Sequence, residues 1–182
     1  MGPVPETRTV ATADLTTAER SAIRKLLDLA FVGNFDDDDF DHALGGLHVL
    51  ILERGEPIAH AAVVQRRFLH ADRSWRGGYV EAVAVHPGRR GQGYAATVMT
   101  EAERIVDHGY DLGALSAAHA GRGLYLHRGW LPWQGSTFVL APDGLTRTEE
   151  DDDSTFVRVV AGGAELRRTG TLACDWRHGD VW

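Results

Sequence analysis

The stretch Tyr79-Val-Glu-Ala-Val-Ala-Val-His-Pro-Gly-Arg-Arg-Gly-Gln-Gly-Tyr-Ala-Ala96 decides the fold of this chain. Its first half, Tyr79–Val85, is apolar and β-branched apart from one carboxylate, Glu81, and it predicts a strand. A glycine-rich basic turn follows. From Ala95 to Val106 apolar residues recur at helical spacing, and Gly109 is suited to end that helix. Strand, glycine turn and helix together predict an anion site, because the first amides of a helix lack intrahelical partners and the helix dipole is positive there.

Composition predicts one globular domain. The chain has 182 residues, 43% of them hydrophobic, and five tryptophans, which is enough to bury a substantial core. We therefore expect a single domain over residues 1–182. The first residues lack the apolar segment of a signal peptide, and no apolar run approaches the roughly 18 residues of a membrane span. These features predict a soluble, cytoplasmic protein with no membrane partner.

Cysteine and histidine usage argues against disulfide and metal chemistry. Cys174 is the only cysteine, so the chain has no internal disulfide framework and no cysteine cluster for zinc. The nine histidines show no metal-ligand spacing, and we predict no metal site.

The charge of the chain is acidic and clustered. A formal net charge of −7 argues against a nucleic-acid partner, because a nucleic-acid binder usually has a basic face. The acid is concentrated at Asp36–Asp39 and Glu149–Asp153. One interpretation is that these residues form solvated loops. The other is that they border a cleft that attracts a polycation.

Seven stretches have the apolar, β-branched composition of strands. They are Thr7–Ala13, His48–Glu53, Pro57–Phe68, Tyr79–Val85, Leu112–Ala117, Trp133–Leu140 and Thr155–Val160. Arg54-Gly-Glu56 predicts a hairpin between the second and the third. Ala71–Gly78 is expected to be a connection, and the residues after Val160 are expected to form a looser tail.

Helices are predicted in the intervals between these strands. A capping-box sequence at Thr16 starts a helix with apolar positions up to Phe31, and Asp36–Leu44 and Ala118–Arg128 predict two more. A strand–helix–strand crossover lies in the middle of the chain. We therefore predict an α/β (α+β) fold, with a mixed central β-sheet of about seven strands and helices on both faces.

Two motifs resemble the GNAT superfamily of N-acetyltransferases. Arg90-Gly-Gln-Gly-Tyr-Ala95 fits the signature (Gln/Arg)-x-x-Gly-x-(Gly/Ala), and it sits between a predicted strand and a helix, as in that superfamily. Leu124-Tyr-Leu-His-Arg-Gly-Trp130 is similar to the superfamily's tyrosine-bearing helix followed by glycine and an aromatic residue. The resemblance implies the GNAT fold, with acetyl-CoA as donor substrate and CoA as product.

A closer resemblance covers nearly the whole chain. Six stretches are similar to the aminoglycoside 2'-N-acetyltransferases of mycobacteria and related bacteria. They are Gly45–Gly46, Ala59–Arg67, Gly78–Glu81, Leu112–Ser116, Arg128–Trp133 and Cys174–Trp182. This resemblance implies acetylation of the 2'-amino group of aminoglycoside antibiotics, hence antibiotic resistance, and a homodimer.

Acetyl-CoA carries a pyrophosphate, which the glycine turn is suited to hold. The candidate phosphate ligands, through backbone amides or side-chain charge, are Arg89, Arg90, Gly91, Gln92, Gly93, Tyr94 and Ala95. In the superfamily the pantetheine arm pairs with the strand that corresponds to Tyr79–Val85. This implicates Val83, Ala84 and Val85, with the Val83 amide as candidate donor to the acetyl carbonyl. The alternative is that the glycine turn only packs the helix on the sheet.

Glu81 and Tyr125 are the candidate catalytic residues. The acceptor amine arrives mostly as an ammonium. Glu81 is the one carboxylate of the predicted strand Tyr79–Val85, and it can take the proton directly or through water. Tyr125 matches the superfamily's tyrosine acid, which protonates the leaving CoA thiolate. The plainer alternatives are a structural or substrate-binding Glu81 and a buried Tyr125 with a local partner. His119 lies near the tyrosine helix, and we expect it to be structural.

An aminoglycoside has several ammonium groups, so its site should be rich in acceptors. The resemblance assigns this site to Asn34, Asp39, Glu81, Ala82, Ser116, Asp151, Asp152, Asp180 and Trp182, the last with its indole and C-terminal carboxylate. Asn34 stands where this family would have an aspartate. The alternative for the tail from Asp180 to Trp182 is a frayed chain end.

Two rival functions remain open from the sequence. One is an acetyltransferase for another cationic amine, such as a polyamine, a peptide amine or a cell-wall amino sugar. The other is a non-catalytic acyl-CoA-binding module that acts through partners. Glu81 and Tyr125 argue against the second rival, because a binding module needs neither residue.

Overall fold

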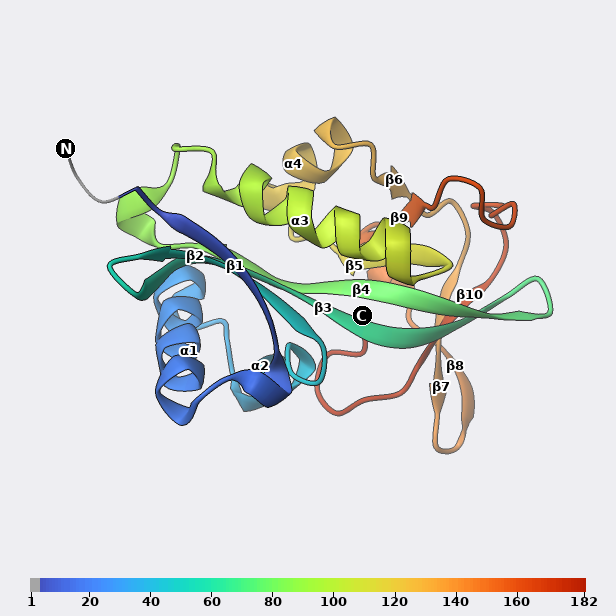
Figure 1. Ribbon diagram of the computed structural model, residues 1–182. Helices are drawn as coiled ribbons and strands as arrows, with labels where there is room; N and C mark the ends of the chain where they lie inside the picture. The colour runs from blue at the N-terminus through green and yellow to red at the C-terminus, as the bar shows by residue number, and fades with distance from the viewer. Residues whose placement is uncertain (1–3) are drawn as a thin grey trace. The chain divides into compact units, whose positions relative to one another are not determined.

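The structure is a computed structural model that describes residues 4–182 (Figure 1), and these residues form two compact units. Unit 1 consists of residues 4–64 together with Val80–Arg104, and unit 2 consists of Gln65–Tyr79 together with Ile105–Trp182. The two long strands and the long helix of the middle of the chain contribute residues to both units. The single domain stays a prediction.

Unit 1 contains the strands β1 (Glu6–Ala11) and β2 (Leu47–Glu53), the beginning of β3 (Glu56–His70) and the end of β4 (Arg73–Val85). β1 and β2 pair antiparallel, with Val10 opposite His48, and β2 and β3 pair antiparallel, with Leu50 opposite His60. The turn Arg54-Gly55 has positive φ at both residues, 54° and 83°, which suits a tight hairpin turn. The predicted hairpin is confirmed.

The helices of unit 1 are α1 (Thr17–Phe31), α2 (Asp37–His42) and the first turns of α3 (Tyr94–Gly109). α1 starts with the predicted capping box, in which Thr16 and Glu19 bond each other's backbone amides. Its residues Ile23 and Leu27 pack on Val10 and Leu50, and α1 and α2 lie on the same side of these strands in Figure 1.

The opposite face of β1 is turned toward α3. Thr9, which alternates with Val10 along the strand, donates from Oγ1 to Glu101 Oε1 of α3 at 3.1 Å. Since neighbouring residues of a strand point to opposite faces, helices cover both faces of the strands in unit 1. This prediction is confirmed.

Unit 2 contains the end of β3, the beginning of β4 and most of the later elements. Its strands are β5 (Leu112–Ser116), β6 (Leu131–Pro132), β7 (Thr137–Ala141), β8 (Gly144–Arg147), β9 (Thr155–Val159) and β10 (Leu172–Asp175). The strand order is β6-β9-β5-β4 and β3-β10-β7-β8. β4 with β5 and β10 with β7 are parallel pairs, and the other pairs of this unit described are antiparallel. The sheet is mixed, as predicted, but residues 4–182 form ten strands rather than about seven.

The predicted connection Ala71–Gly78 is wrong. β3 continues to His70, β4 begins at Arg73, and the turn between them is only Ala71-Asp72. Both turn residues have positive φ, 50° and 56°, in a tight turn without the glycine that usually marks one.

Two glycines lie inside β4 instead of in a loop. A Cβ on Gly77 would stand 2.2 Å from the Phe68 ring, and a Cβ on Gly78 would stand 2.6 Å from the Tyr110 ring. Aromatic rings lie directly on the backbone at these positions, so a glycine pair that resembles a loop signal is a packing requirement.

Three further elements of unit 2 differ from the prediction. The strand expected from Trp133 begins only at Thr137, because the backbone amides of Trp133 and Gln134 donate to Thr155 O and Arg168 O, outside the ladders of β7. The helix expected at Ala118–Arg128 is a 3-10 turn followed by α4 (Arg122–His127). The expected loose tail contains β10, which pairs with β3 and β7.

No helix among residues 4–182 is long and apolar enough to cross a membrane. In the same residues no group of three or more histidine, cysteine, aspartate or glutamate side chains is arranged to hold a metal ion.

Candidate active site

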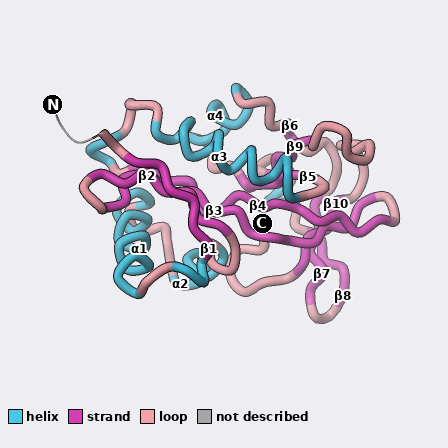
Figure 2. The backbone as a smooth tube through the Cα atoms, viewed as in Figure 1, coloured by secondary structure: helices cyan, strands magenta, loops and turns pink. Residues whose placement is uncertain are grey.

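The end of β4 leads into the predicted glycine turn and helix. A 3-10 turn, Pro87–Arg89, follows the strand, and α3 begins at Tyr94 (Figure 2). Gly91 and Gly93 have φ of 76° and 83°, with open space where a Cβ would stand. The turn is exposed, and the first amides of α3 have no intrahelical acceptors. The strand, turn and helix follow one another as predicted, and such a backbone is suited to a pyrophosphate. Its role as the phosphate site stays a prediction.

The two arginines of the turn also bond to protein groups. The Arg89 guanidinium pairs with the carboxylate of Glu53, and Arg90 Nη2 donates to Ala30 O at 2.9 Å. The positive charge of Arg89 is therefore matched within unit 1. Their role as phosphate ligands stays a prediction.

A residue with left-handed backbone lies inside β4, directly after Glu81. Ala82 has a φ of 49°, in the left-handed region that a non-glycine residue rarely adopts. Its carbonyl oxygen is bonded by His60 Nδ1 at 2.8 Å. Such residues interrupt the regular ladder and redirect the side chains and amides on either side, and they occur often at active sites. Glu81, Ala82 and Val83 are all half-buried.

Some of the aspartates at the start of α2 cap the N-terminus of that helix. Asp36 and Asp39 form a capping box, in which the backbone amide of each donates to the other's carboxylate at 3.0 Å. Asp37 pairs with Arg24. Asn34 is exposed, with its backbone amide on Phe31 O. Asp39 is half-buried, and the assignment of Asp39 and Asn34 to an acceptor site stays a prediction.

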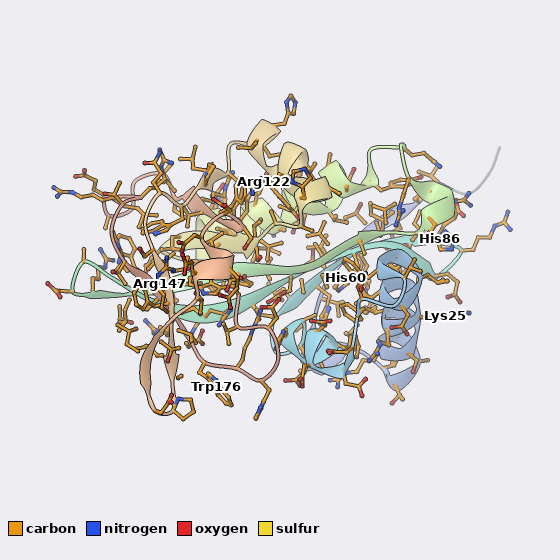
Figure 3. The ribbon with its side chains drawn as sticks, turned by 180° about the vertical axis from the view of Figure 1, so that it is seen from behind. Lys25, His60, His86, Arg122, Arg147 and Trp176 are labelled. Carbon is orange, nitrogen blue, oxygen red and sulfur yellow. The ribbon has the colours of Figure 1, made fainter. Side chains whose placement is uncertain are left out.

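The acidic turn of unit 2 holds two carboxylates in different states. Asp152 accepts from Thr137 N at 2.8 Å and pairs with Arg147 (labelled in Figure 3), and the arginine holds the pKa of Asp152 far below its usual range. Asp151 is buried, and burial, followed by the charges of Asp180, Glu150 and Asp152, raises its pKa to about 6. Asp151 is thus the carboxylate of this turn whose charge an incoming cation would stabilise most.

Replacing Asp151 with asparagine should stabilise unit 2 at neutral pH. An aspartate with an ordinary pKa of 3.8 and a folded pKa of about 6 binds more protons folded than unfolded in that interval, so stability falls as pH rises through it. We expect Asp151→Asn to raise the free energy of unfolding by roughly 1–2 kcal/mol at pH 7.5 and by much less at pH 4. Urea unfolding at both pH values measures this, and an equal gain at both would contradict it.

The tail is anchored in unit 2. Trp182 is 3% exposed, its Nε1 donates to Thr148 Oγ1 at 3.0 Å, and its ring stacks on Phe68 with centroids 5.8 Å apart. Arg66 Nη1 donates to Val181 O at 2.7 Å, and Cys174 Sγ lies 3.4 Å from the same oxygen. The alternative of a frayed end is wrong for Val181 and Trp182.

Thr148 and Ser154 connect the predicted acceptor residues of unit 2. Thr148 bonds the Asp151 side chain as well as the Trp182 indole. Ser154 bonds the Ser116 hydroxyl at 3.1 Å, and its backbone amide donates to Asp151 O at 3.2 Å. Three residues that lie far apart in the sequence therefore meet around one turn. Asp180 is exposed, and its charge acts on Asp151. No sequence motif marks Thr148 or Ser154.

Tyr125 lies on α4 as predicted and is 8% exposed. Its ring contacts Trp130 edge to face at 6.4 Å and Phe156 at 6.5 Å, measured between centroids. Aromatic packing thus fixes the ring, and a phenylalanine at this position would keep the packing.

Comparison with known proteins shows the family of this chain. Residues 14–130 match the model of the Acetyltransferase (GNAT) family. The chain belongs to this family. The aminoglycoside 2'-N-acetyltransferase of Mycolicibacterium fortuitum is 54% identical over 177 residues, which cover 96% of this chain and 91% of that protein.

Solved structures show the same fold at low sequence identity. The GNAT family N-acetyltransferase YhbS from Escherichia coli, in complex with CoA, is 15% identical with a TM-score of 0.65, over 95% of this chain and 92% of that one. An acyl-CoA N-acyltransferase from Pseudomonas aeruginosa is 18% identical with a TM-score of 0.59, over 86% of this chain and all of that one (100%). Enzymes of the GNAT family take acetyl-CoA as donor.

Proposed function

We propose that this GNAT acetyltransferase acetylates the 2'-amino group of aminoglycoside antibiotics by direct transfer from acetyl-CoA, and so confers resistance to them. The observation that carries the proposal is the 54% identity with the Mycolicibacterium fortuitum enzyme over 96% of the chain. A match of this extent includes the acidic turn, which is a part of unit 2 that faces the cationic acceptor in this proposal.

The donor is held by unit 1. Acetyl-CoA supplies an acetyl group activated as a thioester. The amides of Tyr94 and Ala95 and the left-handed glycines of the turn bind its pyrophosphate, and the backbone from Val83 to Val85 aligns its pantetheine arm. The Val83 amide donates to the acetyl oxygen as negative charge develops there.

Two side chains move protons in this proposal. The Glu81 carboxylate accepts the proton that the acceptor ammonium must lose, directly or through one water. The Tyr125 hydroxyl donates a proton to the leaving thiolate of CoA. No covalent enzyme intermediate is required, since the amine attacks the thioester itself.

The acceptor is attracted by acid. The chain carries a formal net charge of −7, which favours approach of a polycation. Asp151 has burial and three like charges opposing its ionised form, so an ammonium beside it relieves an unfavourable charge. The other residues proposed to bind the aminoglycoside are Ser116, Asp180, Trp182, Asp39, Asn34 and Ala82. Asp152 acts indirectly in this scheme, because Arg147 already neutralises it.

Replacing Glu81 with glutamine should remove the acidic limb of the pH–rate profile. The amide has nearly the shape of the carboxylate but accepts no proton, so we expect kcat/KM to fall by about 100-fold at pH 7. The rate should then depend less on pH below neutrality. Steady-state rates between pH 5 and 9 measure both effects. Glu101→Gln on α3 is the control, because Glu101 bonds Thr9 and Arg104 and has no role in the proposed reaction. An unchanged acidic limb would assign the base to another group.

Release of CoA thiol with a panel of amines tests the function itself. We expect turnover with aminoglycosides that carry a 2'-amine and none with analogues that have a 2'-hydroxyl. Turnover only with polyamines, peptide amines or cell-wall amino sugars would favour the first rival. Binding of acetyl-CoA without turnover of any amine would favour the acyl-CoA-binding module.

We further propose that the protein is a cytoplasmic homodimer and binds no nucleic acid. Sedimentation equilibrium of the purified chain checks the dimer, and a single species at 19.9 kDa would contradict it.

A further inference from the structure

Two histidines lie in the core of unit 1, side by side on neighbouring strands. His48 of β2 and His60 of β3 are both 0% exposed, and His60 is labelled in Figure 3. Leu50 stands opposite His60 and His48 stands opposite Ala62, so both rings lie on the strand face that α1 covers through Leu50. Neither ring has a role in the proposed reaction, and all four ring nitrogens have hydrogen-bond partners.

The partners form one continuous relay with a defined direction. His60 Nδ1 lies 2.8 Å from Ala82 O, and a carbonyl only accepts, so this nitrogen carries the proton. Burial lowers the pKa of His60 to about 3, so the ring is neutral and its Nε2 accepts from His48 Nδ1 at 2.9 Å. Burial and then Arg20 lower the pKa of His48 to about 4, so its Nε2 accepts from Thr12 Oγ1 at 2.8 Å.

The far end of the relay is fixed to the backbone. Thr12 Oγ1 accepts from the amide of Gly45 at 2.9 Å, and the backbone carbonyl of Thr12 accepts from Arg20 Nη2 at 3.1 Å. Each group in the relay therefore has only one orientation that satisfies all its neighbours.

Stability alone gives no reason for such a relay. Burying a polar pair costs the free energy of its hydration, and the hydrogen bonds within the pair do little more than offset that cost. Apolar residues of the same shape often give a protein that is as stable or more stable. What the relay adds is a fixed orientation of the carbonyl group at its end. Its last bond is made to a backbone carbonyl at the left-handed residue of β4, between Glu81 and Val83.

The direction of that carbonyl sets the direction of the next amide. The peptide that joins Ala82 to Val83 is planar and trans, so its C=O and N–H point to opposite sides. In a regular ladder the carbonyl would accept from a backbone amide of the neighbouring strand, whereas here a side chain binds it. The bond from His60 thus holds the Ala82 carbonyl on one side and aims the Val83 amide toward the other.

We propose that Thr12, His48 and His60 are positioning residues for acetyl transfer. They hold the Ala82–Val83 peptide so that the Val83 amide points at the acetyl oxygen and the Glu81 side chain points at the acceptor amine. The proposal rests on the proposed function, in which Val83 and Glu81 act on the donor and the acceptor. The three relay residues touch neither substrate.

The first test replaces the end of the relay. His60→Leu keeps the volume and removes the bond to Ala82, and we expect kcat to fall about 10- to 100-fold, since small misplacement of an oxyanion donor costs this much. The KM for acetyl-CoA should change less than about 3-fold, because the pyrophosphate cradle is untouched. His60→Asn keeps a donor in place of Nδ1, and kcat should return to within about 5-fold of the natural protein.

His70→Leu is the matched control. His70 is also buried, and its Nδ1 also bonds a backbone carbonyl, that of Thr171 at 2.8 Å in unit 2. We expect His70→Leu to lower the melting temperature with kcat unchanged. Loss of kcat in His70→Leu equal to that in His60→Leu, or kcat of His60→Leu within about 2-fold of the natural protein, would overturn the proposal.

Two further variants keep the proposal testable if the His60→Leu protein does not fold. Thr12→Val and His48→Asn disturb the relay from its far end, and we expect kcat to fall about 3- to 10-fold with both proteins folded. NMR gives a readout that needs no acceptor: the Val83 amide and Ala82 carbonyl resonances of the acetyl-CoA complex should move in the relay variants and stay in place in His70→Leu. Unmoved resonances would overturn the relay. Absent turnover of every aminoglycoside by the natural protein would overturn only the proposed function.

Discussion

We expect the replacement of Tyr125 with phenylalanine to lower kcat by about 100-fold and to leave the KM for acetyl-CoA almost unchanged, because in the proposed reaction the hydroxyl is needed only when the thiolate leaves. The ring stays packed between Trp130 and Phe156, so the fold is expected to be intact. Steady-state kinetics with acetyl-CoA as varied substrate measures this, with a melting curve to show that the variant is folded.

Tyr110→Phe is the control for that experiment. Tyr110 is a tyrosine of the same unit that packs over Gly78 and has no place in the proposed site. Removal of its hydroxyl should leave kcat within about 2-fold of the value for the natural protein. Equal kcat in Tyr125→Phe and the natural protein would remove Tyr125 as the acid and leave it as a packing residue.

We expect the deletion of Val181 and Trp182 to destabilise unit 2 by about 3–5 kcal/mol and, if the tail binds the acceptor as proposed, to raise the aminoglycoside KM by at least about 10-fold. The deletion opens a cavity against Phe68 and removes a bond that Thr148 makes. It also takes the Val181 carbonyl from Arg66, a guanidinium that is 4% exposed, and a buried charge that loses an acceptor is costly. Urea unfolding and steady-state kinetics measure the two effects.

Trp182→Ala and Trp176→Ala separate the parts of this prediction. Trp182→Ala keeps the carbonyl for Arg66, so it should lose less stability than the deletion. Trp176 is 42% exposed, and its replacement should cost less than about 1 kcal/mol. An unchanged aminoglycoside KM in the deletion variant would leave the tail with a structural role only.

Local signals in the sequence predicted the parts of the fold that short-range chemistry decides. The capping box at Thr16, the hairpin at Arg54-Gly55 and the turn before α3 each combine a residue type with the backbone geometry that it favours. These elements appear where they were expected. The paired glycines Gly77 and Gly78 gave the wrong answer, since rings that come from Phe68 and Tyr110 require them, and long-range packing has no local signal.

β10 and the left-handed Ala82 were beyond local reasoning for a related cause. β10 is a four-residue strand stabilised by pairing with β3 and β7, so its own sequence does not indicate it. An alanine at a φ of 49° contradicts local preference, and it persists because its surroundings, including the bond from His60, hold it. Conflict between local preference and the fold is expected mainly at functional positions.

The candidate site was predictable where family motifs supplied it. The donor turn and Tyr125 lie on the elements expected for them, and Ser116, Asp151 and Trp182 meet in unit 2. The state of each carboxylate was not predictable. Asp151 and Asp152 are neighbours in the sequence, and only the structure shows that Arg147 neutralises one while burial raises the pKa of the other.

Cys174 makes the chemistry of this protein convenient to follow. It is the chain's only cysteine, it is 0% exposed, and burial raises its pKa to about 11. Disulfide reagents react with thiolates, so the folded protein should contribute almost no colour of its own to such a reagent. Every thiol detected during turnover then counts one molecule of CoA released. In the absence of substrate, the rate at which Cys174 is labelled should report the rate at which the tail that covers it opens.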